Sequence, residues 1–460
     1  MGAVWTQFVI LGDLNMEFKN RSENLYWIWL AESLGAGNKY LSRLVKFFGS
    51  SFDIYNSTEE EIIRSKAANE QIARKLADKS LKRAYQILDY CSVKNIGVLS
   101  YGDKNYPERL RMMQDPPAVL YYKGTLPDFD QRVCIGVVGT RTMSEYGKRA
   151  GYKLAYELAS AGAVVVSGMA LGVDSVAACG AMVADGTTVA VLGCGIDVVY
   201  PPQHKKLQRV IEERGVVLTE YAPGTKPYGS NFPMRNRIIS GLCQGTLVVE
   251  ADEGSGALLT ARNALMQGRG VFALPGNIDR DTSSGTNGLI KDGARFVTCA
   301  EDILSNYELI YGKSLNYSAL TFARQIFNPD ACDEALGKLG VAFRENKKAV
   351  RVEDESSRLR PTRRPTIPED TTRPTTNKAT QQKKALIIPK KLQSDGSEKI
   401  LESLDEETKK IFLEFPLDRA VTVDQICKMG HDPSEVISAV TVLEMKGLIS
   451  ALPGNIYVRR

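Results

Sequence analysis

The sequence predicts an α/β protein built on a doubly wound parallel sheet, with a helical module before the sheet and a smaller module after it. Three observations support this fold class. Apolar, β-branched runs recur between residues 133 and 274, helical patterns separate most of them, and glycine-rich turns follow several runs. Repeated strand–helix units favour parallel strands covered by helices on both faces. The 460 residues are enough for several domains.

The first part of the chain predicts an extension followed by short helices. Residues 1–23 begin with an apolar run that lacks a basic leader and a small-residue cleavage site, so we interpret them as an extension and not as a signal peptide. Residues 24–95 predict a helical module, with Ser57-Thr-Glu-Glu60 as a capping box. The turn Gly35-Ala-Gly37 is typical of a SAM-like or helix-hairpin-helix (HhH) module and could offer N–H groups to a phosphate. A plain helical bundle for protein contacts is an equal alternative.

Residues 96–310 predict the α/β domain. Helical patterns cover 146–160 and 258–267. The predicted strands are the β-branched runs Val133–Val138, Val164–Val166, Thr188–Leu192, Val216–Leu218, Thr246–Val249 and Val271–Leu274.

Residues 311–398 predict a connecting segment that ends in a basic linker. From 344 to 391 the chain has five prolines and fourteen Lys/Arg against six Asp/Glu, a net charge of +8. This composition predicts disorder. The linker could attract phosphates without specificity, or it could be a solvated spacer.

Residues 399–460 predict three helices followed by a hairpin, which is the order of a winged helix. The helices are expected from Asp405 to Phe415, near Thr422, and from Asp432 onward. The third helix carries acidic residues where a DNA-reading helix should be basic. Protein contact and DNA reading therefore both stay open for this module.

Composition excludes several classes of protein. Hydrophobic residues make up 43%, charged residues 25%, and the net charge is +5, which permits a polyanionic partner without demanding one. No apolar run is long enough to span a bilayer, so we expect no membrane partner. The eight cysteines form no C-x-x-C pair and the two histidines stand apart from them, so we expect no metal site and a reducing, cytoplasmic location.

Two glycine-rich turns at strand ends are candidate phosphate sites. Gly139-Thr140-Arg141 follows the first predicted strand, and Ser144 stands near the start of the next helix. Gly168 lies in the turn Ser167–Gly172, after the second strand. Helix N-termini at the carboxyl ends of strands favour anions. Neither turn matches the dinucleotide fingerprint or the Walker A loop, so no nucleotide cofactor is expected.

The segment from Asn231 to Gly241 is the strongest candidate for nucleic-acid contact. Phe232, Arg235, Asn236 and Arg237 stand together there. An aromatic ring can stack on a base while guanidinium groups pair with phosphates. Because Phe232 precedes a proline, we expect it in an extended backbone ahead of the helix.

Other turns complete the candidate edge. Ser255 and Gly256 could cradle a phosphate, and Lys291 lies in the segment assigned to the rim. Glu250 is interpreted as an internal anchor for Arg235 or Arg237. The turn after Gly193 is interpreted as structural. No arrangement of residues predicts a catalytic group, and we expect no catalytic residue.

In this order along an α/β sheet, the motifs together resemble the DprA/Smf family of bacterial DNA-processing proteins, over about residues 24–302 and the C-terminal module. The resemblance rests on Gly139-Thr-Arg141 with Ser144-x-Tyr-Gly147, Ser167-Gly-x-Ala-x-Gly172, Tyr200-Pro201, Phe232-Pro-x-Arg-Asn-Arg237, Glu250-Ala with Ser255-Gly256 and Thr260, and Pro275-Gly276.

The resemblance implies an extended Rossmann-like fold without dinucleotide chemistry. It also implies single-stranded DNA binding, homodimerisation, and loading of RecA recombinase during natural transformation, with a single-strand binding protein as a further partner to test. Arg141, Phe232, Arg235, Asn236 and Arg237 are the matching DNA-contact positions. The sequence departs from the family pattern in two places, with Thr140 where serine is usual and Ala177-Ala178 where the family has Ala-His.

Two alternatives remain. LOG-type nucleotide phosphoribohydrolases use a similar sheet but need Pro-Gly-Gly-x-Gly-Thr-x-x-Glu, and this chain has Glu250-Ala-Asp-Glu-Gly-Ser-Gly256 followed by Ala-Leu-Leu-Thr260. The other alternative is an adaptor that recruits partners through its terminal module. The expected class is a non-enzymatic DNA-binding protein.

Overall fold

The structure is a computed structural model that describes residues 23–329, 331–343, 404–416, 421–427, 429, 431–446, 448–452 and 456–459. The chain divides into two compact units, Met1–Glu355 and Ser356–Arg460. The predicted N-terminal extension up to residue 22 and the basic linker 344–391 lie outside the described residues.

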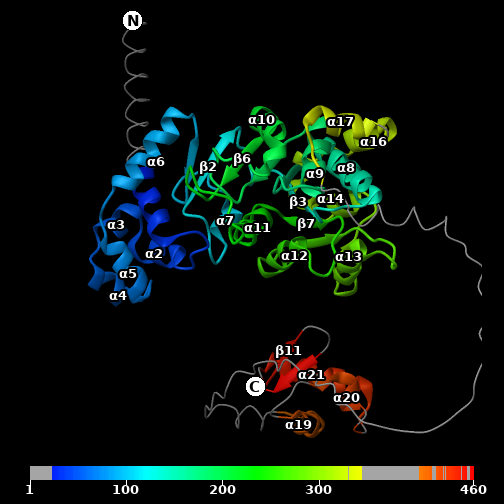
Figure 1. The fold of residues 1–460 in the computed structure, drawn as a ribbon. Helices are drawn as coiled ribbons and strands as arrows, with labels where there is room; N and C mark the ends of the chain where they lie inside the picture. The colour runs from blue at the N-terminus through cyan, green and yellow to red at the C-terminus, as the bar shows by residue number, and fades with distance from the viewer. Residues whose placement is uncertain are drawn as a thin grey trace, which may run out of the picture. The chain divides into compact units, whose positions relative to one another are not determined.

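The first unit begins with the predicted helices, drawn in blue in Figure 1. The capping box is present one residue later than expected, with Thr58 as the N-cap and Glu61 as its partner. A helix over residues 23–34 is followed by α2 (Leu41–Phe48), α3 (Ser51–Asn56), α4 (Glu59–Ser65), α5 (Glu70–Ala77) and α6 (Lys82–Val93).

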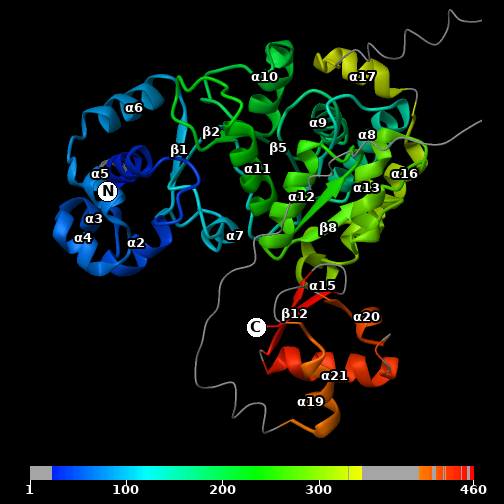
Figure 2. The same cartoon turned by 60° about the horizontal axis from the view of Figure 1, so that its bottom comes forward.

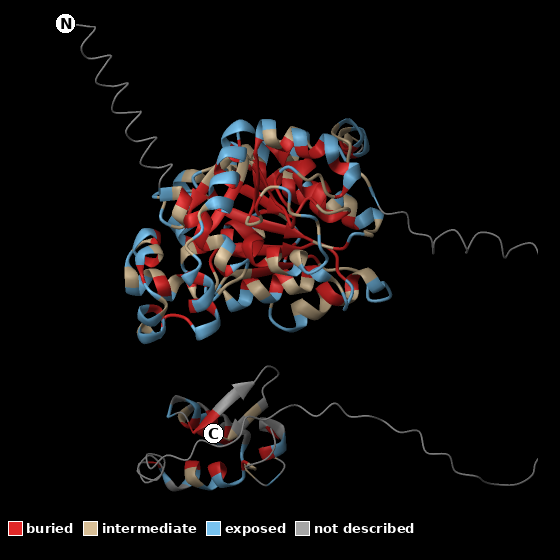
Figure 3. Cartoon of the chain, turned by 60° about the vertical axis from the view of Figure 1, so that its left-hand side comes forward, coloured by how far each residue is buried: buried red, intermediate tan, exposed pale blue. Residues whose placement is uncertain are grey.

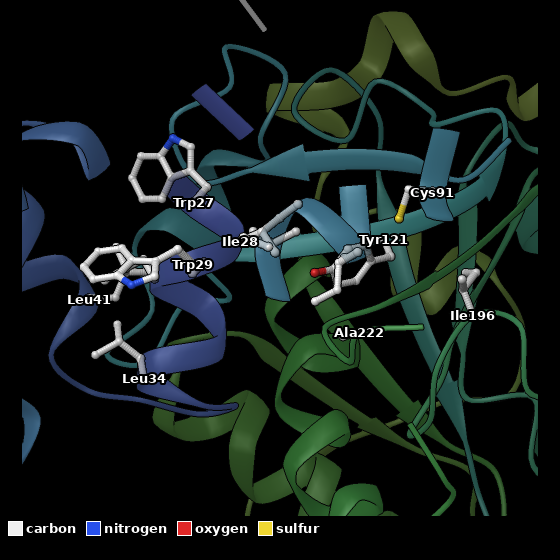
Figure 4. Packing of buried hydrophobic residues seen from close by; sticks show 14 of the residues in the cluster. Trp27, Ile28, Trp29, Leu34, Leu41, Cys91, Tyr121, Ile196 and Ala222 are labelled. Carbon is white, nitrogen blue, oxygen red and sulfur yellow. The ribbon is translucent and has the colours of Figure 1, made fainter. Parts of the chain in front are cut away.

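These helices share one hydrophobic core with the sheet that follows. Trp27, Ile28 and Leu41 belong to the same buried cluster as Tyr121 and Ile196, as Figure 4 shows. Burying this surface jointly stabilises a helical segment that is short of apolar partners of its own. The expected boundary near residue 95 is therefore crossed by a continuous core.

The sheet has nine strands in the order β1-β2-β6-β5-β4-β3-β7-β8-β9. All six predicted strands are present, as β3 to β8. The strands are β1 (Gly97–Ser100), β2 (Val119–Gly124), β3 (Cys134–Val138), β4 (Val164–Ser167), β5 (Thr188–Val191), β6 (Val216–Thr219), β7 (Gly245–Val248), β8 (Gly270–Ala273) and β9 (Arg295–Phe296).

The sheet is parallel from β6 to β9, but β1 and β2 are antiparallel additions at one edge. The predicted parallel, doubly wound sheet is confirmed for β3 to β8, and the two antiparallel edge strands were not predicted. The connection between β1 and β2 contains only the one-turn helix α7 (Glu108–Arg111) and brings the chain back beside β1 in the opposite direction, so the two strands pair antiparallel.

Helices cover both faces of this sheet, and its central strands β3 to β7 are buried throughout (Figure 3). Ile135 and Val137 face the side covered by α8 and α9, and Val138 and Val166 face the side covered by α11 and α12. The covering helices are α8 (Glu145–Ser160), α9 (Val173–Val183), α10 (Lys205–Arg214), α11 (Asn231–Leu242), α12 (Gly256–Met266) and α13 (Asp281–Lys291).

Shorter elements complete the unit. Part of the predicted connecting segment is helical, with α16 packed against α8 and α17 against α9. The elements are α7 (Glu108–Arg111), η1 (Pro202–His204), α14 (Glu301–Leu304), α15 (Glu308–Tyr311), η2 (Gly312–Ser314), α16 (Tyr317–Ile326) and α17 (Ala331–Leu339).

The second unit has the predicted order of three helices and a hairpin. Asp405 caps the first helix by accepting a hydrogen bond from the Thr408 N–H, and Pro433 begins the third. One short strand was not predicted, and it joins the hairpin in the sheet order β10-β12-β11. The elements are α19 (Glu406–Leu413), β10 (Val421–Thr422), α20 (Val423–Cys427), α21 (Pro433–Met445), β11 (Ile449–Leu452) and β12 (Ile456–Arg459).

Candidate nucleic-acid interface

The candidate site lies at the carboxyl ends of the central parallel strands. The chain leaves β3 at Gly139, β4 at Gly168 and β5 near Gly193. The strand order reverses between β3 and β7, and ligands of open α/β sheets bind at such a switch point. A small pocket at this edge is lined by Arg141, Gly168, Ala170, Leu171, Leu192, Gly193, Cys194, Tyr200, Pro201, Phe232 and Arg235.

Phe232 is the aromatic centre of this pocket. Its ring is half-buried and lies 5.1 Å from the ring of Tyr200. A Cβ atom at Gly193 would lie 2.9 Å from the Phe232 ring, so only glycine lets the ring rest on that backbone. The turn after β5, which was interpreted as structural, is thus part of the site.

The predicted extended backbone at Phe232 was wrong. α11 begins at Asn231 and already includes Phe232 and Pro233. A proline in the first helical turn loses nothing, because the N–H groups there have no partner within the helix. The first turn of α11 therefore presents the ring.

Two guanidinium groups flank the Phe232 ring. The Cζ atom of Arg141 lies 5.7 Å from the ring centroid and that of Arg235 lies 5.9 Å from it, both within cation–π range. Arg141 is exposed, whereas Arg235 retains only 4% of its accessible surface. The two arginines therefore have different environments although they flank the same ring.

Arg235 is tied to the sheet. Its Nη1 donates to the carbonyl oxygen of Gly168 at 2.8 Å and to that of Val191. Burial lowers the pKa of Arg235, and the Asp174 carboxylate opposes this effect. Arg235 therefore holds the ends of β4 and β5 together, which differs from the expected solvent-facing phosphate ligand.

Arg237 faces away from the ring into a buried ion pair. Its Nη2 donates to the Glu220 carboxylate, and its Nη1 donates to the backbone oxygen of Asp115 at 2.6 Å. The Gly37 N–H also donates to Glu220, at 3.4 Å. Burial raises the pKa of Glu220, and Arg237 opposes the shift. Arg237 and Gly37, both considered for phosphate contact, are thus used to dock the helical module.

Glu250 anchors the loop that carries Arg141. It is 2% exposed, and its carboxylate accepts hydrogen bonds from the Ser144 N–H at 2.8 Å and the Ser144 hydroxyl at 2.5 Å. Its backbone oxygen accepts from the Thr140 N–H at 2.7 Å. Glu250 is an internal anchor as predicted, but the predicted partner, Arg235 or Arg237, was wrong, since Ser144 binds Glu250.

Gly172 and Thr140 shape the same loop. A Cβ at Gly172 would lie 2.8 Å from the Cα of Arg141, and Gly172 has a φ of +86°. Both the lack of space and the backbone conformation therefore require glycine at this position. The Thr140 hydroxyl accepts from the Thr142 N–H at 3.2 Å and is buried. Thr140 therefore shapes the turn, and its hydroxyl is not presented to a ligand.

The remaining predicted residues fall into two groups. Asn236 donates to the backbone oxygen of Gly256 at 3.4 Å, which joins α11 to the start of α12, the helix beside it (Figure 2). Ser255 caps α12 by accepting from the Ala257 N–H. Lys291 is the last residue of α13. An eleven-residue helix is about 16 Å long, so Lys291 lies a helix length from the strand-end edge.

Sequence reasoning missed Gly193 and Tyr200 as supports of the aromatic ring. The position of Tyr200-Pro201 a few residues after the glycine turn at Gly193 could have indicated that these residues lie at the same edge. His204 ends η1 and is fully buried. Among the described residues, no three His, Cys, Asp or Glu side chains are arranged to hold a metal ion, and no helix is long and apolar enough to cross a membrane.

The fold and the site define a doubly wound α/β protein with an arginine-flanked aromatic ring at its switch-point edge. The family model described as DNA recombination-mediator protein A matches residues 97–308. Protein Smf of Synechocystis is 35% identical over 289 residues, covering 62% of this chain and 73% of the relative. DNA processing protein DprA of Streptococcus pneumoniae is 43% identical over 206 residues, covering 45% and 72%.

The fold comparison agrees with these relatives. The X-ray structure of DNA processing protein A from Streptococcus pneumoniae aligns with a TM-score of 0.53 and 35% identity, covering 61% of this chain and 97% of that one. The chain belongs to the DprA/Smf family.

Proposed function

We propose that this chain binds single-stranded DNA at the carboxyl edge of its sheet as part of DNA processing for recombination. The observation that carries the proposal is the Phe232 ring, which is held on Gly193 between two guanidinium groups. The ring offers a face to a base, and the exposed Arg141 offers a fork to a phosphate. The relatives' description as DNA processing proteins supports the same role.

The finer proposal is that the protein loads RecA recombinase onto the bound strand during natural transformation, in the cytoplasm and as a homodimer. Family membership supports it. RecA filament formation should be measured on oligonucleotides coated with single-strand binding protein. We expect faster filament formation with the wild-type chain than with Arg141→Ala. Equal rates with and without the wild-type chain would contradict the loading role.

The site supports a binding role more than the phosphoribohydrolase alternative. Glu250 begins the segment that stands in place of the phosphoribohydrolase motif, and it is 2% exposed and bound by Ser144. A carboxylate engaged in this way acts as an anchor for the loop. Incubation with nucleoside monophosphates should release no free base, and release of base that disappears in Glu250→Gln would favour the enzyme.

The direct test is a titration of labelled oligonucleotides, single-stranded against duplex, across salt concentrations. We expect tighter binding to the single strand and no sequence preference. The logarithm of affinity should fall linearly with the logarithm of salt, with a slope of roughly −0.7 per phosphate contacted. Binding that ignores salt, or a clear preference for duplex, contradicts the proposal.

A further inference from the structure

A second aromatic ring borders the exposed arginine of the candidate site. Phe343 is 44% exposed and lines a hollow of about 170 Å³ together with Arg141, Met143, Ser144, Glu145 and Lys148. Arg141 also lines the pocket that contains Phe232. One exposed guanidinium is thus shared by two hollows, each with a phenylalanine in its wall.

We infer that Phe343 is a second base-stacking platform of the single-strand site, with Arg141 between it and Phe232. The inference rests on the proposed function, and it assigns a contact to a residue beyond the family-matched region, which ends at residue 308. Grooves for single strands combine positive charge along the backbone with aromatic rings on which successive bases stack. Two rings bordering one arginine meet that description.

The backbone around Phe343 is held in place by His204. The Nε2 atom of His204 accepts a hydrogen bond from the Ala342 N–H at 3.1 Å. Its Nδ1 atom lies 3.0 Å from the backbone oxygen of Met169, in the turn after β4, and donates to it. This histidine therefore attaches the residue before Phe343 directly to the edge that carries the site.

The segment before Phe343 is packed as well. Cys332 and Leu336 of α17 are buried with Val176 and Cys179 of α9, and the Val341 N–H donates to the backbone oxygen of Leu336 at 2.9 Å. These contacts bring the chain back across α9 to the strand ends. An exposed ring on a held backbone costs less entropy to stack than one on a free chain.

Charges around the hollow are arranged to leave Arg141 available. Glu145 pairs with Lys148 at 2.8 Å and with Arg149 at 3.1 Å. Lys148 also pairs with Asp333 of α17 at 2.7 Å. The carboxylates that would repel a phosphate are thus matched by these cations, and Arg141 stays exposed for the strand.

The first experiment uses Phe343→Trp in the full chain, titrated with an unlabelled oligonucleotide. The chain already has Trp5, Trp27 and Trp29, so the signal of the new indole is the difference between the titrations of the variant and of the wild-type chain. We expect its fluorescence to be quenched with the midpoint seen by anisotropy. The control is Phe322→Trp on α16, where Phe322 is 61% exposed and stands two residues from Arg324, which pairs with Glu157 far along α8. We expect no quenching there, and equal quenching in both variants overturns the inference.

The second experiment measures affinity and melting temperature for Phe343→Ala and Phe343→Leu. Loss of one stacked base should weaken binding about fivefold to a hundredfold, with the salt slope and melting temperature unchanged. Leucine keeps apolar bulk without a π face, so it should weaken binding as much as alanine. Wild-type affinity in Phe343→Ala, beside weakened binding in Phe232→Ala, overturns the second platform and leaves the proposed function standing. A wild-type chain without single-strand binding overturns the proposed function itself.

Discussion

At the scale of single residues, Arg141 and Arg235 flank the same ring but differ in burial. Arg141 is exposed, and Arg235 is bonded to the backbone of β4 and β5. An exposed arginine can bind a phosphate and release its counterions. The N–H groups of a buried arginine already donate hydrogen bonds to carbonyl oxygens. In the proposed site, the charge offered to DNA and the charge that shapes the pocket therefore belong to different residues.

Arg141→Ala should lower both single-strand affinity and the salt slope, because one phosphate contact is lost. Arg235→Ala should instead lower the melting temperature, because the Gly168 and Val191 oxygens lose a buried donor. The measurement is affinity across salt beside thermal unfolding for both variants. A smaller slope in Arg235→Ala with normal melting would show that Arg235 contacts phosphate after all.

Phe232→Ala should cost roughly 1–3 kcal/mol of single-strand affinity if a base stacks on the ring. The salt slope should barely change, since no charge is lost. The ring is half-buried against Gly193 and Tyr200, so thermal unfolding must be measured beside affinity. Normal melting with weak binding supports stacking, and a large fall in melting temperature with intact binding by the folded protein rules it out.

At the scale of elements, buried acid groups join loops and helices into one surface. Glu250 at the end of β7 holds Ser144 at the start of α8. The Glu220 carboxylate, after β6, accepts hydrogen bonds from the Arg237 side chain of α11 and from the Gly37 N–H of the helical module. Removing one partner from a buried ion pair leaves an uncompensated charge and costs about 3–5 kcal/mol. These carboxylates therefore fix the site's frame.

Gly147→Ala should disturb the first of these contacts. A Cβ at Gly147 would lie within 2.2 Å of Oε2 of Glu250, so Glu250 must move and Ser144 must lose a partner. We expect a lower melting temperature and weaker single-strand binding through the Arg141 loop. The matched control is Gly151→Ala, one turn along α8, where the nearest atom would be 3.5 Å away and the higher helix propensity of alanine should help. Equal melting of the two variants would refute the role given to Gly147.

At the scale of the whole molecule, the later part of the sheet carries exposed apolar side chains. Within residues 245–303, Ile278 is 98% exposed, Met266 78% and Phe296 63%, and Phe296 lies on β9, the last strand of the sheet. An exposed apolar side chain on an edge strand, such as Phe296, is a candidate for burial at an interface. We place the proposed pairing of two chains in this region.

We expect a C₂ homodimer whose two copies use the same patch. The double variant Ile278→Asp, Phe296→Asp should be monomeric in light scattering at micromolar concentration. It should also bind single strands more weakly, because the effective concentration of the second site is lost. Phe47→Asp, at a 61% exposed position on α2, is the control. A monomeric wild-type chain, or a double variant that stays dimeric, would contradict this interface.

The sequence by itself determined the features that depend on neighbours along the chain. β-branched runs identified β3 to β8, because a strand buried on both faces needs such residues throughout. The glycine turns marked the strand ends, and the placement of Phe232 beside Arg235 indicated the edge that we propose as the binding site.

Tertiary structure alone decided which of these groups are free to act. Glu250 stands 106 positions from Ser144, and Ala342 stands 138 from His204. The sequence around each of these residues shows that it carries a polar group but does not identify the distant partner of that group. Which of them meet depends on how helices and loops pack over the sheet, because each buried donor or charge must find a partner there. Packing therefore turned Arg235 and Arg237 inward and left Arg141 exposed.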